Sequence, residues 1–357
     1  MKAVILVGGV GSRMRPLTYH TPKPLLSLFN RPILEWILTR LADVGVDEAV
    51  LSLGYLPDSF RESYPSNEAC GVRLVYACED EPLDTAGAIG FAARTAGIDE
   101  TFLVLNGDVL TDLDLAALID THRSKGGLAT ITLSEVEDPS RFGVVEFDET
   151  GRATAFVEKP APGTSSSRWI NAGTYVFEPE VLELIEPGRP VSVERETFVT
   201  LAERGELFAY CSDSYWLDSG TPEALLAASS DILMGRRQAP GELVEQARVD
   251  EGNWVEGAVE MRGEVQTSYI SSDVELGDEV VVVGSLLERG VRVGQGASIA
   301  NSIVMAGAVI GNGARIYNSI VGPRSHIGSD VLLGDLTVVG FDTEIGSGRV
   351  HLADKVN

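Results

Sequence analysis

Cysteine and histidine are scarce in this sequence, with three cysteines and four histidines among 357 residues. Cys70, Cys78 and Cys211 lie far apart and show neither the spacing of a metal site nor the framework of a disulfide-stapled fold. Such scarcity is typical of proteins that work in a reducing compartment. We therefore expect a cytoplasmic protein without disulfides.

Long apolar runs are also missing. No apolar segment approaches the ~20 residues that a membrane-spanning helix needs. The apolar run 3–7 near the N-terminus ends in glycines and is too short for a secretory signal. We expect no membrane partner.

Basic residues are outnumbered, with 28 Lys and Arg against 53 Asp and Glu, which gives a formal net charge of −25. Nucleic acids and anionic membranes repel such a chain, so neither is an expected partner. An anionic small substrate must instead be held by a local cluster of basic side chains.

A glycine-rich loop directly after a short apolar strand contains such a cluster. Its glycines, serine and cations are Gly8, Gly9, Gly11, Ser12, Arg13, Arg15 and Lys23. Bare backbone N–H groups after a strand suit a phosphate, and arginines suit a polyanion such as a nucleoside triphosphate. The loop is not the kinase or ATPase phosphate loop, because no Lys-Ser/Thr pair follows its last glycine. Its glycine spacing also differs from the dinucleotide-binding fingerprint.

Strands and helices alternate over the first two-thirds of the chain. We expect strands at 2–7, 48–53, 72–77 and 101–106, a helix opened by Pro32, and a hairpin of 143–147 with 152–157. Asp112 or Asp114 can cap a helix that runs to 125, and Thr221 can cap a helix with Pro222 at its first position. This alternation predicts an α/β, Rossmann-like, mostly parallel sheet with helices on both faces. Ligands of such sheets bind beyond the carboxyl ends of the strands, so Gly8 and Asp108 are expected to face one cleft.

The last third of the chain carries a nearly literal repeat. Segment 294–304 recurs at 311–321, and aliphatic-glycine pairs begin at 276, 293, 310, 327 and 345, at spacings of 17, 17, 17 and 18 residues. Three faces of about six residues per coil predict a parallel β-helix. The pattern divides the chain into an α/β domain over 1–232, a linker over 233–264 and a β-helix domain over 265–357.

Residues 8–25 resemble the signature GGxGTRLRPLT…PKPL of the sugar-1-phosphate nucleotidyltransferases, or NDP-sugar pyrophosphorylases, with Ser12 for Thr and Met14 for Leu. The resemblance extends over the whole chain and is closest to the mannose-1-phosphate guanylyltransferases. It implies that residues 1–232 form the catalytic domain and that the β-helix is of the left-handed hexapeptide-repeat type. The implied reaction transfers a nucleoside monophosphate from an NTP to a sugar 1-phosphate and releases pyrophosphate.

The resemblance also implies roles for the matching residues around the triphosphate. Arg13 would hold the β- and γ-phosphates, and Lys23 would contact the phosphate near the α position. Asp108 and Asp218 match the family's metal-binding aspartates; the alternative for each is a turn or cap residue. Mg²⁺ is the expected cofactor, because it prefers carboxylates and bridges the reacting phosphate oxygens.

The sugar phosphate would be bound by two further motifs. In Glu158-Lys159-Pro160 the lysine grips the phosphate and Glu158 takes sugar hydroxyls, and in Asn171-Ala172-Gly173 the asparagine touches the sugar. A solvated Glu-Lys pair and a turn asparagine are the alternatives. The catalytic set implied by the resemblance is Arg13, Lys23, Asp108, Lys159 and Asp218.

Base recognition is assigned to residues 79–88. A carboxylate only accepts hydrogen bonds, so Glu79 suits the two adjacent donors on the guanine edge, and GTP is the expected nucleotide. Thr85 and Gly107 complete the implied nucleotide site. Asp84 stands where the family usually has Gly, and its alternative role is to cap the helix that starts near Thr85.

Segments 174–182 and 191–198, the latter with Glu194, resemble mannose-1-phosphate enzymes, so mannose 1-phosphate is the expected sugar. Glucose 1-phosphate with dTTP or UTP, and a heptose 1-phosphate with GTP, remain alternatives. A non-catalytic regulatory subunit of the same fold is another alternative. An acyltransferase lacks support, since neither His326 nor His351 lies in a recognisable acceptor motif. Family analogy predicts a homo-oligomer.

Overall fold

The computed structural model describes residues 1–165, 167–238, 247–250, 252–257, 259 and 262–357. Within these residues the chain divides into two compact units, Met1–Gly9 with Leu34–Trp216, and Val10–Ile33 with Leu217–Asn357. The division runs through the glycine loop, so that Gly8 and Gly9 belong to the first unit and Gly11 belongs to the second. No helix in the described part of the chain is long and apolar enough to cross a membrane.

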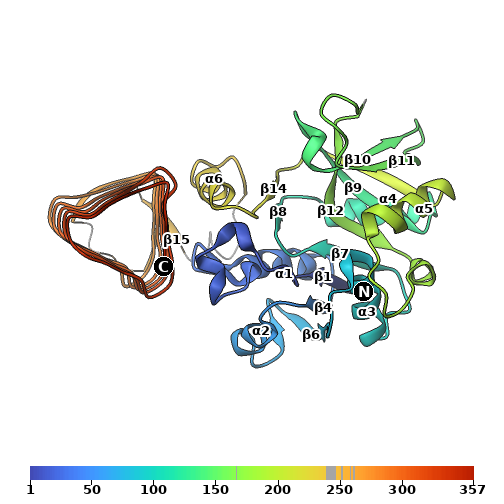
Figure 1. Cartoon of the computed structure of the whole chain (residues 1–357), viewed down its shortest axis with the longest axis horizontal. Coiled ribbons are helices and arrows are strands. Elements are labelled where there is room, and N and C mark those ends of the chain that lie inside the picture. The colour runs from blue at the N-terminus through green and yellow to red at the C-terminus, as the bar shows by residue number, and fades with distance from the viewer. Residues whose placement is uncertain (166, 239–246, 251, 258, 260–261) are drawn as a thin grey trace. The chain divides into compact units, whose positions relative to one another are not determined.

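The first unit is built on a ten-stranded mixed sheet (Figure 1). Strands β7, β1, β4 and β6 are neighbours in that order and all parallel, as the alternation predicts. Among the described residues between β9 and β12, the helical structure is limited to one 3₁₀ turn, Pro139–Arg141, and the neighbouring strands there are antiparallel. The strands are β1 (Lys2–Leu6), β4 (Glu48–Leu53), β5 (Glu68–Ala69), β6 (Val72–Cys78), β7 (Phe102–Asn106), β9 (Ala129–Glu135), β10 (Gly143–Phe147), β11 (Ala153–Glu158), β12 (Trp169–Phe177) and β13 (Leu207–Ser212).

Helices cover both faces of the central strands. Ala3, Val4 and Ile5 of β1 are all 0% exposed, and successive side chains of a strand point to opposite faces. Helix α3 packs against β1, β4 and β6, whereas α4 packs against β9, β12 and β13. The helices of this unit are α1 (Ile33–Asp43), α2 (Pro57–Ser63), α3 (Asp84–Thr95), α4 (Leu115–Lys125) and α5 (Phe198–Glu203). The first residue of α1, Ile33, still belongs to the segment Val10–Ile33 of the second unit.

Two helix starts follow the sequence signals. The side chain of Asp114 accepts a hydrogen bond from the Ala117 N–H at 2.9 Å, so Asp114, not Asp112, caps α4. In the second unit Thr221 caps α6 (Pro222–Leu233), with Pro222 at the first helical position, as predicted.

The second unit joins the segment 10–33 to the C-terminal region. The segment contains the 3₁₀ turns η1 (Ser12–Met14), η2 (Leu17–Tyr19) and η3 (Lys23–Leu25), and a hairpin of β2 (Ser27–Leu28) and β3 (Arg31–Pro32). Strand β14 (Trp216–Asp218) crosses the boundary into this unit.

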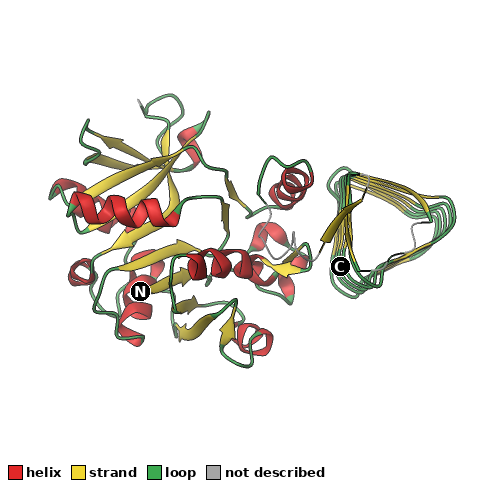
Figure 2. Ribbon diagram, turned by 180° about the vertical axis from the view of Figure 1, so that it is seen from behind, coloured by secondary structure: helices red, strands yellow, loops and turns green. Residues whose placement is uncertain are grey.

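The C-terminal region is a parallel β-helix whose three sheets form its three faces, seen end-on as a triangle in Figure 2. The first sheet comprises β15 (Ala247–Asp250), β16 (Asn253–Glu256), β18 (Tyr269–Ile270), β21 (Leu286–Leu287), β24 (Ile303–Val304), β27 (Ile320–Val321), β30 (Val338–Val339) and β33 (Lys355–Val356). The second comprises β17 (Gly263–Gln266), β20 (Val280–Val283), β23 (Ser298–Ala300), β26 (Arg315–Tyr317), β29 (Leu332–Gly334) and β32 (Val350–Leu352). The third comprises β19 (Glu275–Leu276), β22 (Arg292–Val293), β25 (Val309–Ile310), β28 (His326–Ile327) and β31 (Glu344–Ile345).

A serine ladder shows why the repeat is so literal. The hydroxyl oxygens of Ser268, Ser285 and Ser302 each accept a hydrogen bond, at 3.1 Å, from the N–H of the serine one coil later. Each hydroxyl also donates to a carbonyl two residues back in its own coil. A 17-residue period thus satisfies buried polar groups coil after coil.

The predicted fold class, a Rossmann-like domain followed by a parallel β-helix, is confirmed. The handedness of the β-helix and the boundaries at 232 and 265 stay predictions. Within the predicted linker, residues 239–246, 251, 258 and 260–261 lie outside the described residues, while β15, β16 and the start of β17 lie inside it.

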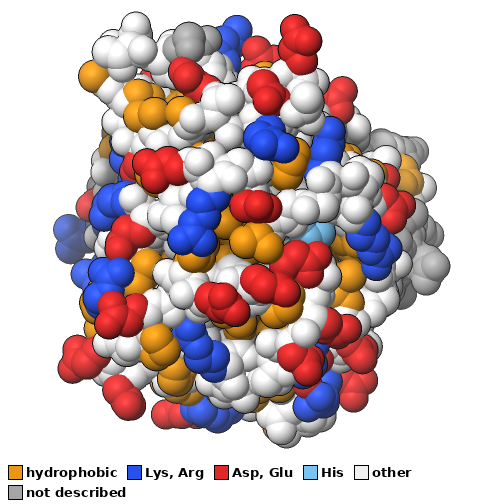
Figure 3. Space-filling view, turned by 90° about the vertical axis from the view of Figure 1, so that its right-hand side faces the viewer, with side chains coloured by type: hydrophobic (Ala, Val, Ile, Leu, Met, Phe, Trp, Pro, Cys, Tyr) orange, Lys and Arg blue, Asp and Glu red, His pale blue; other side chains and the backbone are white. Residues whose placement is uncertain are grey.

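The negative charge is not gathered into one field on the face drawn in Figure 3, where acidic and basic side chains are interspersed. Anion binding has to depend on particular residues.

We predict that Gly311→Ala lowers the free energy of unfolding of the β-helix by about 1–3 kcal/mol, through overpacking. A Cβ at Gly311 would lie 2.5 Å from backbone atoms of Gly328 and Ser329, which cannot yield. Gly346→Ala is the matched control, because a Cβ there meets no atom within 4 Å. Urea unfolding followed by circular dichroism measures the difference, and equal midpoints for the two variants would contradict the prediction.

Candidate functional site

Several candidate residues of the first unit lie at one edge of its sheet, beyond the carboxyl ends of the parallel strands. Leu6 at the end of β1 is in register with Asn106 at the end of β7, so Gly8 and Gly107-Asp108 follow neighbouring strand ends. The Gly107 N–H donates to the Leu6 carbonyl at 2.9 Å, and a Cβ on Gly107 would lie only 2.4 Å from Val7 Cγ1. Gly107 is therefore required for close strand approach, which holds Asp108 at this edge.

Glu79 continues the same edge, directly after β6. Its Oε1 accepts from the Ser52 hydroxyl at 2.9 Å, and its Oε2 accepts from the Leu83 N–H at 3.0 Å. Because each carboxylate oxygen has two acceptor positions, the side chain is fixed and still has acceptor capacity. Ser52 is a small polar residue near the end of the buried strand β4, and that was the only sequence signal for it.

Thr85 ties the first turn of α3 to a distant segment. Its hydroxyl donates to Glu194 Oε2 at 2.7 Å and accepts from the Val193 N–H at 2.8 Å. The Val191 carbonyl accepts from the Ala86 and Gly87 N–H groups. Glu194 is the second residue of a π-helical turn, Val193–Thr197, a geometry that is frequent at functional sites.

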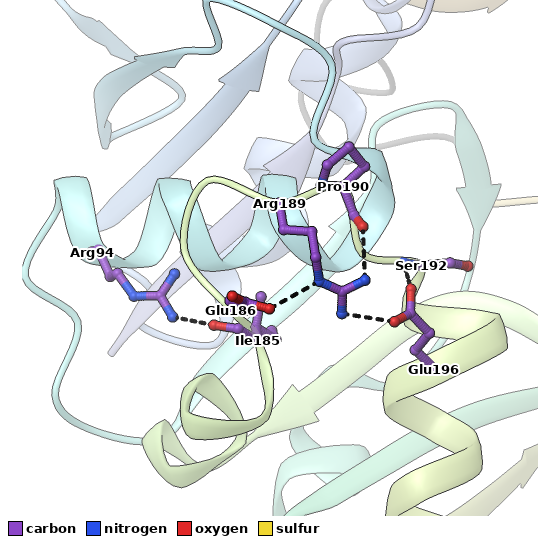
Figure 4. Close-up of polar contacts among 7 residues, drawn as sticks. All are labelled: Arg94, Ile185, Glu186, Arg189, Pro190, Ser192 and Glu196. Atoms are coloured by element: carbon purple, nitrogen blue, oxygen red, sulfur yellow. Dashed lines mark hydrogen bonds and ion pairs between the residues drawn. The ribbon is translucent and has the colours of Figure 1, made fainter.

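An arginine braces the loop that precedes this turn (Figure 4). The Arg189 guanidinium donates to Glu186 Oε2 at 3.1 Å and to Glu196 Oε2 at 2.8 Å, while Glu196 Oε1 accepts from the Ser192 N–H. Arg94 of α3 donates to the Ile185 carbonyl at 2.7 Å. These contacts fix the loop against α3, whose first turn lies within the segment 79–88 assigned to base recognition.

Asp84 has a left-handed backbone, with φ of 57°. Glycine adopts this conformation freely and aspartate tolerates it better than most residues, so the backbone fits both Asp84 and the glycine usual in the family. Asp84 Oδ1 accepts from the adjacent Thr85 N–H at 2.8 Å, and α3 begins at Asp84 itself. The alternative reading of Asp84 as the cap of the helix is therefore not what the structure has.

Glu158 and Lys159 lie at the end of β11. Lys159 Nζ donates to Glu158 Oε1 at 2.7 Å, yet the lysine side chain is 61% exposed. Lys159 has φ of 48°, an uncommon conformation for a residue with a side chain. Backbone of this kind clusters at ligand-binding positions.

Asn171 and Gly173 lie at an irregularity in the pairing of β12 with β9, of the kind found beside active sites. Asn171 Oδ1 accepts from the Gly173 N–H, and its Nδ2 donates to the Tyr175 hydroxyl, both at 2.9 Å. Gly173 has φ of 76°, and a Cβ there would lie 2.5 Å from Asn106 Nδ2.

Tyr175 is buried and its hydroxyl is influenced by several of the acidic candidates. Burial raises the pKa of Tyr175 most, and the negative charges of Glu194, Glu158 and Asp108 raise it further. The charges of three carboxylates from separate segments therefore act on one phenol, which also accepts a hydrogen bond from Asn171. Sequence reasoning did not assign Tyr175, since a tyrosine in a buried strand is ordinarily core packing.

The second unit holds the rest of the glycine loop. Gly11 has φ of 63° and precedes the 3₁₀ turn η1, whose first two residues, Ser12 and Arg13, are exposed. The Gly11 carbonyl accepts from the Met14 N–H at 2.9 Å and from the Thr18 hydroxyl at 2.8 Å. The loop is thus fixed from within while Arg13 stays accessible.

Asp218 lies between the two predicted phosphate-binding cations. Arg13 Nη2 is 3.7 Å from Asp218 Oδ2, and Lys23 Nζ is 3.7 Å from Asp218 Oδ1. The Gly220 N–H donates to Asp218 Oδ1 at 2.8 Å. Lys23 is only 6% exposed, so its ammonium is held in place by its surroundings.

The predicted site residues therefore gather in two sets, one within each unit. In the first unit the set is Gly8, Gly9, Glu79, Thr85, Gly107, Asp108, Glu158, Lys159, Asn171 and Gly173. In the second unit it is Gly11, Ser12, Arg13, Lys23 and Asp218. No group of three or more His, Cys, Asp or Glu side chains that could hold a metal ion occurs among the described residues.

Comparisons with known proteins agree with both parts of the chain. Residues 2–235 match the nucleotidyl transferase family, and residues 264–354 match the GMPPB C-terminal domain. A mannose-1-phosphate guanylyltransferase of Mycobacterium tuberculosis is 39% identical over 81% of this chain and 80% of that protein. A mannose-1-phosphate guanylyltransferase catalytic subunit beta of Drosophila pseudoobscura pseudoobscura is 41% identical over 66% of this chain and 64% of that protein.

Solved structures match about two-thirds of the chain. The crystal structure of HddC from Yersinia pseudotuberculosis has a TM-score of 0.54 and 30% identity, and covers 64% of this chain and 97% of that chain. The same protein complexed with GMP-PN has a TM-score of 0.53 and 29% identity, with the same shares covered. From the glycine loop, the candidate residues at the sheet edge and these matches, we conclude that the chain belongs to the nucleotidyl transferase family.

Proposed function

We propose that this protein is a mannose-1-phosphate guanylyltransferase, which transfers GMP from GTP to mannose 1-phosphate, forms GDP-mannose and releases pyrophosphate. The observation that carries the proposal is the pair of cations, Arg13 in the glycine loop and Lys23 after it, that Asp218 holds in place. The names of the relatives at about 40% identity support the choice of sugar and base.

Charge neutralisation is the first requirement of the reaction, because two anions have to meet. Arg13 suits the β- and γ-phosphates, since its guanidinium is planar, exposed and always charged. Lys23 suits the phosphate near the α position as a compact, fixed point charge. Both cations stabilise the charge that develops on the departing pyrophosphate.

Mg²⁺ is the proposed cofactor, with Asp108 and Asp218 as its protein ligands. Mg²⁺ is usually bound by one or two carboxylates together with substrate phosphates and waters, so the two aspartates fit it without a larger cluster. When bound, the metal would polarise the reacting phosphate oxygens. Asp218 would have a second role, because its carboxylate also orients Arg13 and Lys23.

The sugar phosphate falls to residues of the first unit. Lys159 provides an exposed ammonium for the phosphate, and Glu158 and Asn171 provide acceptors and donors for sugar hydroxyls. For the base, Glu79 is proposed to accept from guanine N1–H and N2–H. Its bonds to Ser52 and Leu83 hold it in place for that role. Thr85 and the glycines Gly8, Gly9, Gly11 and Gly107 complete the proposed nucleotide site, with Ser12.

A regulatory subunit of the same fold is the weaker alternative. It would be expected to have lost the loop arginine, the lysine after Glu158 or a metal aspartate, and this sequence has all of them. We keep the division into a catalytic domain (1–232), a linker (233–264) and a β-helix (265–357), a cytoplasmic location and homo-oligomerisation as parts of the proposal.

Pyrophosphate release tests the proposal directly. We expect GTP with mannose 1-phosphate to exceed every other pairing of GTP, UTP, dTTP, ATP or CTP with mannose 1-phosphate or glucose 1-phosphate by about tenfold or more, which is about 1.4 kcal/mol. Removal of Mg²⁺ with a chelator should abolish turnover, and added Mg²⁺ should restore it. If dTTP or UTP with glucose 1-phosphate is preferred, the substrate assignment is wrong. If no pairing reacts, the regulatory alternative gains.

We predict that Asp108→Asn keeps the fold and lowers kcat by about a hundredfold or more, the usual cost of losing a transition-state electrostatic contact. The measurement is initial rate at saturating GTP and mannose 1-phosphate. Asp120→Asn is the control, because Asp120 is an exposed residue of α4. A fully active Asp108→Asn enzyme would refute the metal role.

We predict that Lys159→Gln raises the KM for mannose 1-phosphate by about tenfold or more, because a hydrogen bond from a charged group is worth about 1.5–3 kcal/mol. The KM for GTP should change by less than about twofold. The control is Lys125→Gln, which removes an exposed lysine that donates only to the Thr150 carbonyl. Equal increases in both KM values would count against a specific sugar-phosphate contact.

A further inference from the structure

The segment that carries Arg13 and Lys23 belongs to the same compact unit as the β-helix. It ends in the β2–β3 hairpin, whose two-residue loop is Phe29-Asn30, because Leu28 pairs with Arg31. Both loop residues are left-handed, with φ of 58° and 57°, as a type I′ hairpin turn requires. The turn points the Asn30 side chain at the β-helix.

Asn30 directs its whole amide into the β-helix. Its Oδ1 accepts from the Arg289 N–H at 2.9 Å, and its Nδ2 donates to the Tyr269 hydroxyl at 2.8 Å, to Glu256 Oε2 at 3.2 Å and to the Ser271 hydroxyl. The neighbouring Phe29 ring meets the Tyr269 ring edge-on at 5.0 Å.

Glu288 holds the hairpin from the other side. Its Oε1 accepts from the Ser27 hydroxyl at 2.6 Å and from the Asn30 N–H at 3.3 Å, while its Oε2 accepts from the Ala306 N–H at 3.2 Å. The side chain is 0% exposed. A buried carboxylate is costly unless its hydrogen bonds are made, and most of those on Glu288 come from the hairpin.

Tyr269 and Glu288 both break the coil repeat. Tyr269 aligns in register with Leu286, Ile303 and Ile320, so the three coils that follow have an aliphatic residue at that position. At the spacing of Glu288, the coil before has Ser271, and the coils after have Met305 and Gly322. Such local departures from a literal repeat are expected where a functional contact replaces regular packing.

The last coil contacts the same segment near its other end. Lys355 of β33 donates to the Arg13 carbonyl at 3.1 Å. The β-helix thus contacts the segment both at the phosphate-binding turn and at the hairpin that follows Lys23.

We infer that Asn30, Tyr269 and Glu288 are positioning residues for nucleoside triphosphate binding: the β-helix fixes the hairpin and thereby Arg13 and Lys23. This inference rests on the proposed function. The β-helix would thus act on nucleotide binding alone, because the sugar-phosphate candidates Lys159 and Asn171 belong to the other unit. Loosening the hairpin should therefore weaken nucleotide binding and leave sugar-phosphate binding intact.

The test uses the full chain and three variants, Asn30→Gly, Glu288→Met and Tyr269→Phe. Glycine keeps the left-handed backbone at position 30, and methionine is the residue of the next coil at the position of Glu288. Asn318→Gly is the matched control, because Asn318 has a similar φ of 45° at an exposed corner of the β-helix. Steady-state kinetics gives KM for both substrates, and calorimetry gives the Kd of GTP with Mg²⁺.

We expect Asn30→Gly and Glu288→Met to raise the KM and Kd for GTP by about fivefold or more, and Tyr269→Phe by about twofold, since more hydrogen bonds are lost in the first two. The KM for mannose 1-phosphate should stay within about twofold, and Asn318→Gly should match the wild type. Unchanged GTP binding in folded variants, or equal increases in both KM values, overturns the inference. If Glu288→Met does not fold, Asn30→Gly decides, because it leaves the β-helix sequence intact.

Wild-type measurements separate the two conclusions. A wild-type chain that releases no pyrophosphate from GTP and mannose 1-phosphate overturns the proposed function. A wild-type chain that does so, with variants that bind GTP normally, overturns only the positioning role.

Discussion

The Asp218 carboxylate between Arg13 and Lys23 is the interaction on which the proposed chemistry depends. A chain with a net charge of −25 repels anions, so two cations have to be held where a triphosphate can meet them. The Asp218 carboxylate oxygens lie 3.7 Å from Arg13 Nη2 and from Lys23 Nζ. Glycine at position 220 leaves room for Arg13, since a Cβ there would lie 2.5 Å from the guanidinium. The negative charge of this carboxylate offsets the repulsion between the two cations.

The sheet of the first unit solves a different problem, which is to bring polar groups from distant segments to one edge. Parallel strands end at the same edge of a sheet, so residues that follow β1, β6 and β7 lie at one edge although they are far apart in sequence. Hydrogen-bond partners then fix the side chains of the candidates: Ser52 holds Glu79, Tyr175 holds Asn171, and Thr85 holds Glu194. Pre-organisation of this kind is what an in-line transfer between two bound substrates requires.

The β-helix has a regular core and an irregular contact. Its serine ladder and aliphatic interior repeat every 17 residues because each coil must satisfy the next. At Tyr269 and Glu288 polar side chains interrupt the repeat, and both form hydrogen bonds with the hairpin of the segment 10–33. Burial raises the pKa of Glu288, while the hydrogen bonds from Ser27, Asn30 and Ala306 oppose that shift. The carboxylate is thus tolerated in the core through its partners.

The sequence by itself determined the glycine loop, the strand–helix alternation, the 17-residue repeat and the caps Asp114 and Thr221, because each is a local pattern with a local physical cause. Only the tertiary structure decided that the glycine loop divides between two units, since compactness depends on contacts across more than 200 residues of sequence. It also decided that the charges of Glu194, Glu158 and Asp108 act on Tyr175, and that Asn30 forms hydrogen bonds with the β-helix. A buried tyrosine and a turn asparagine look ordinary in sequence, and only their partners in space give them a role.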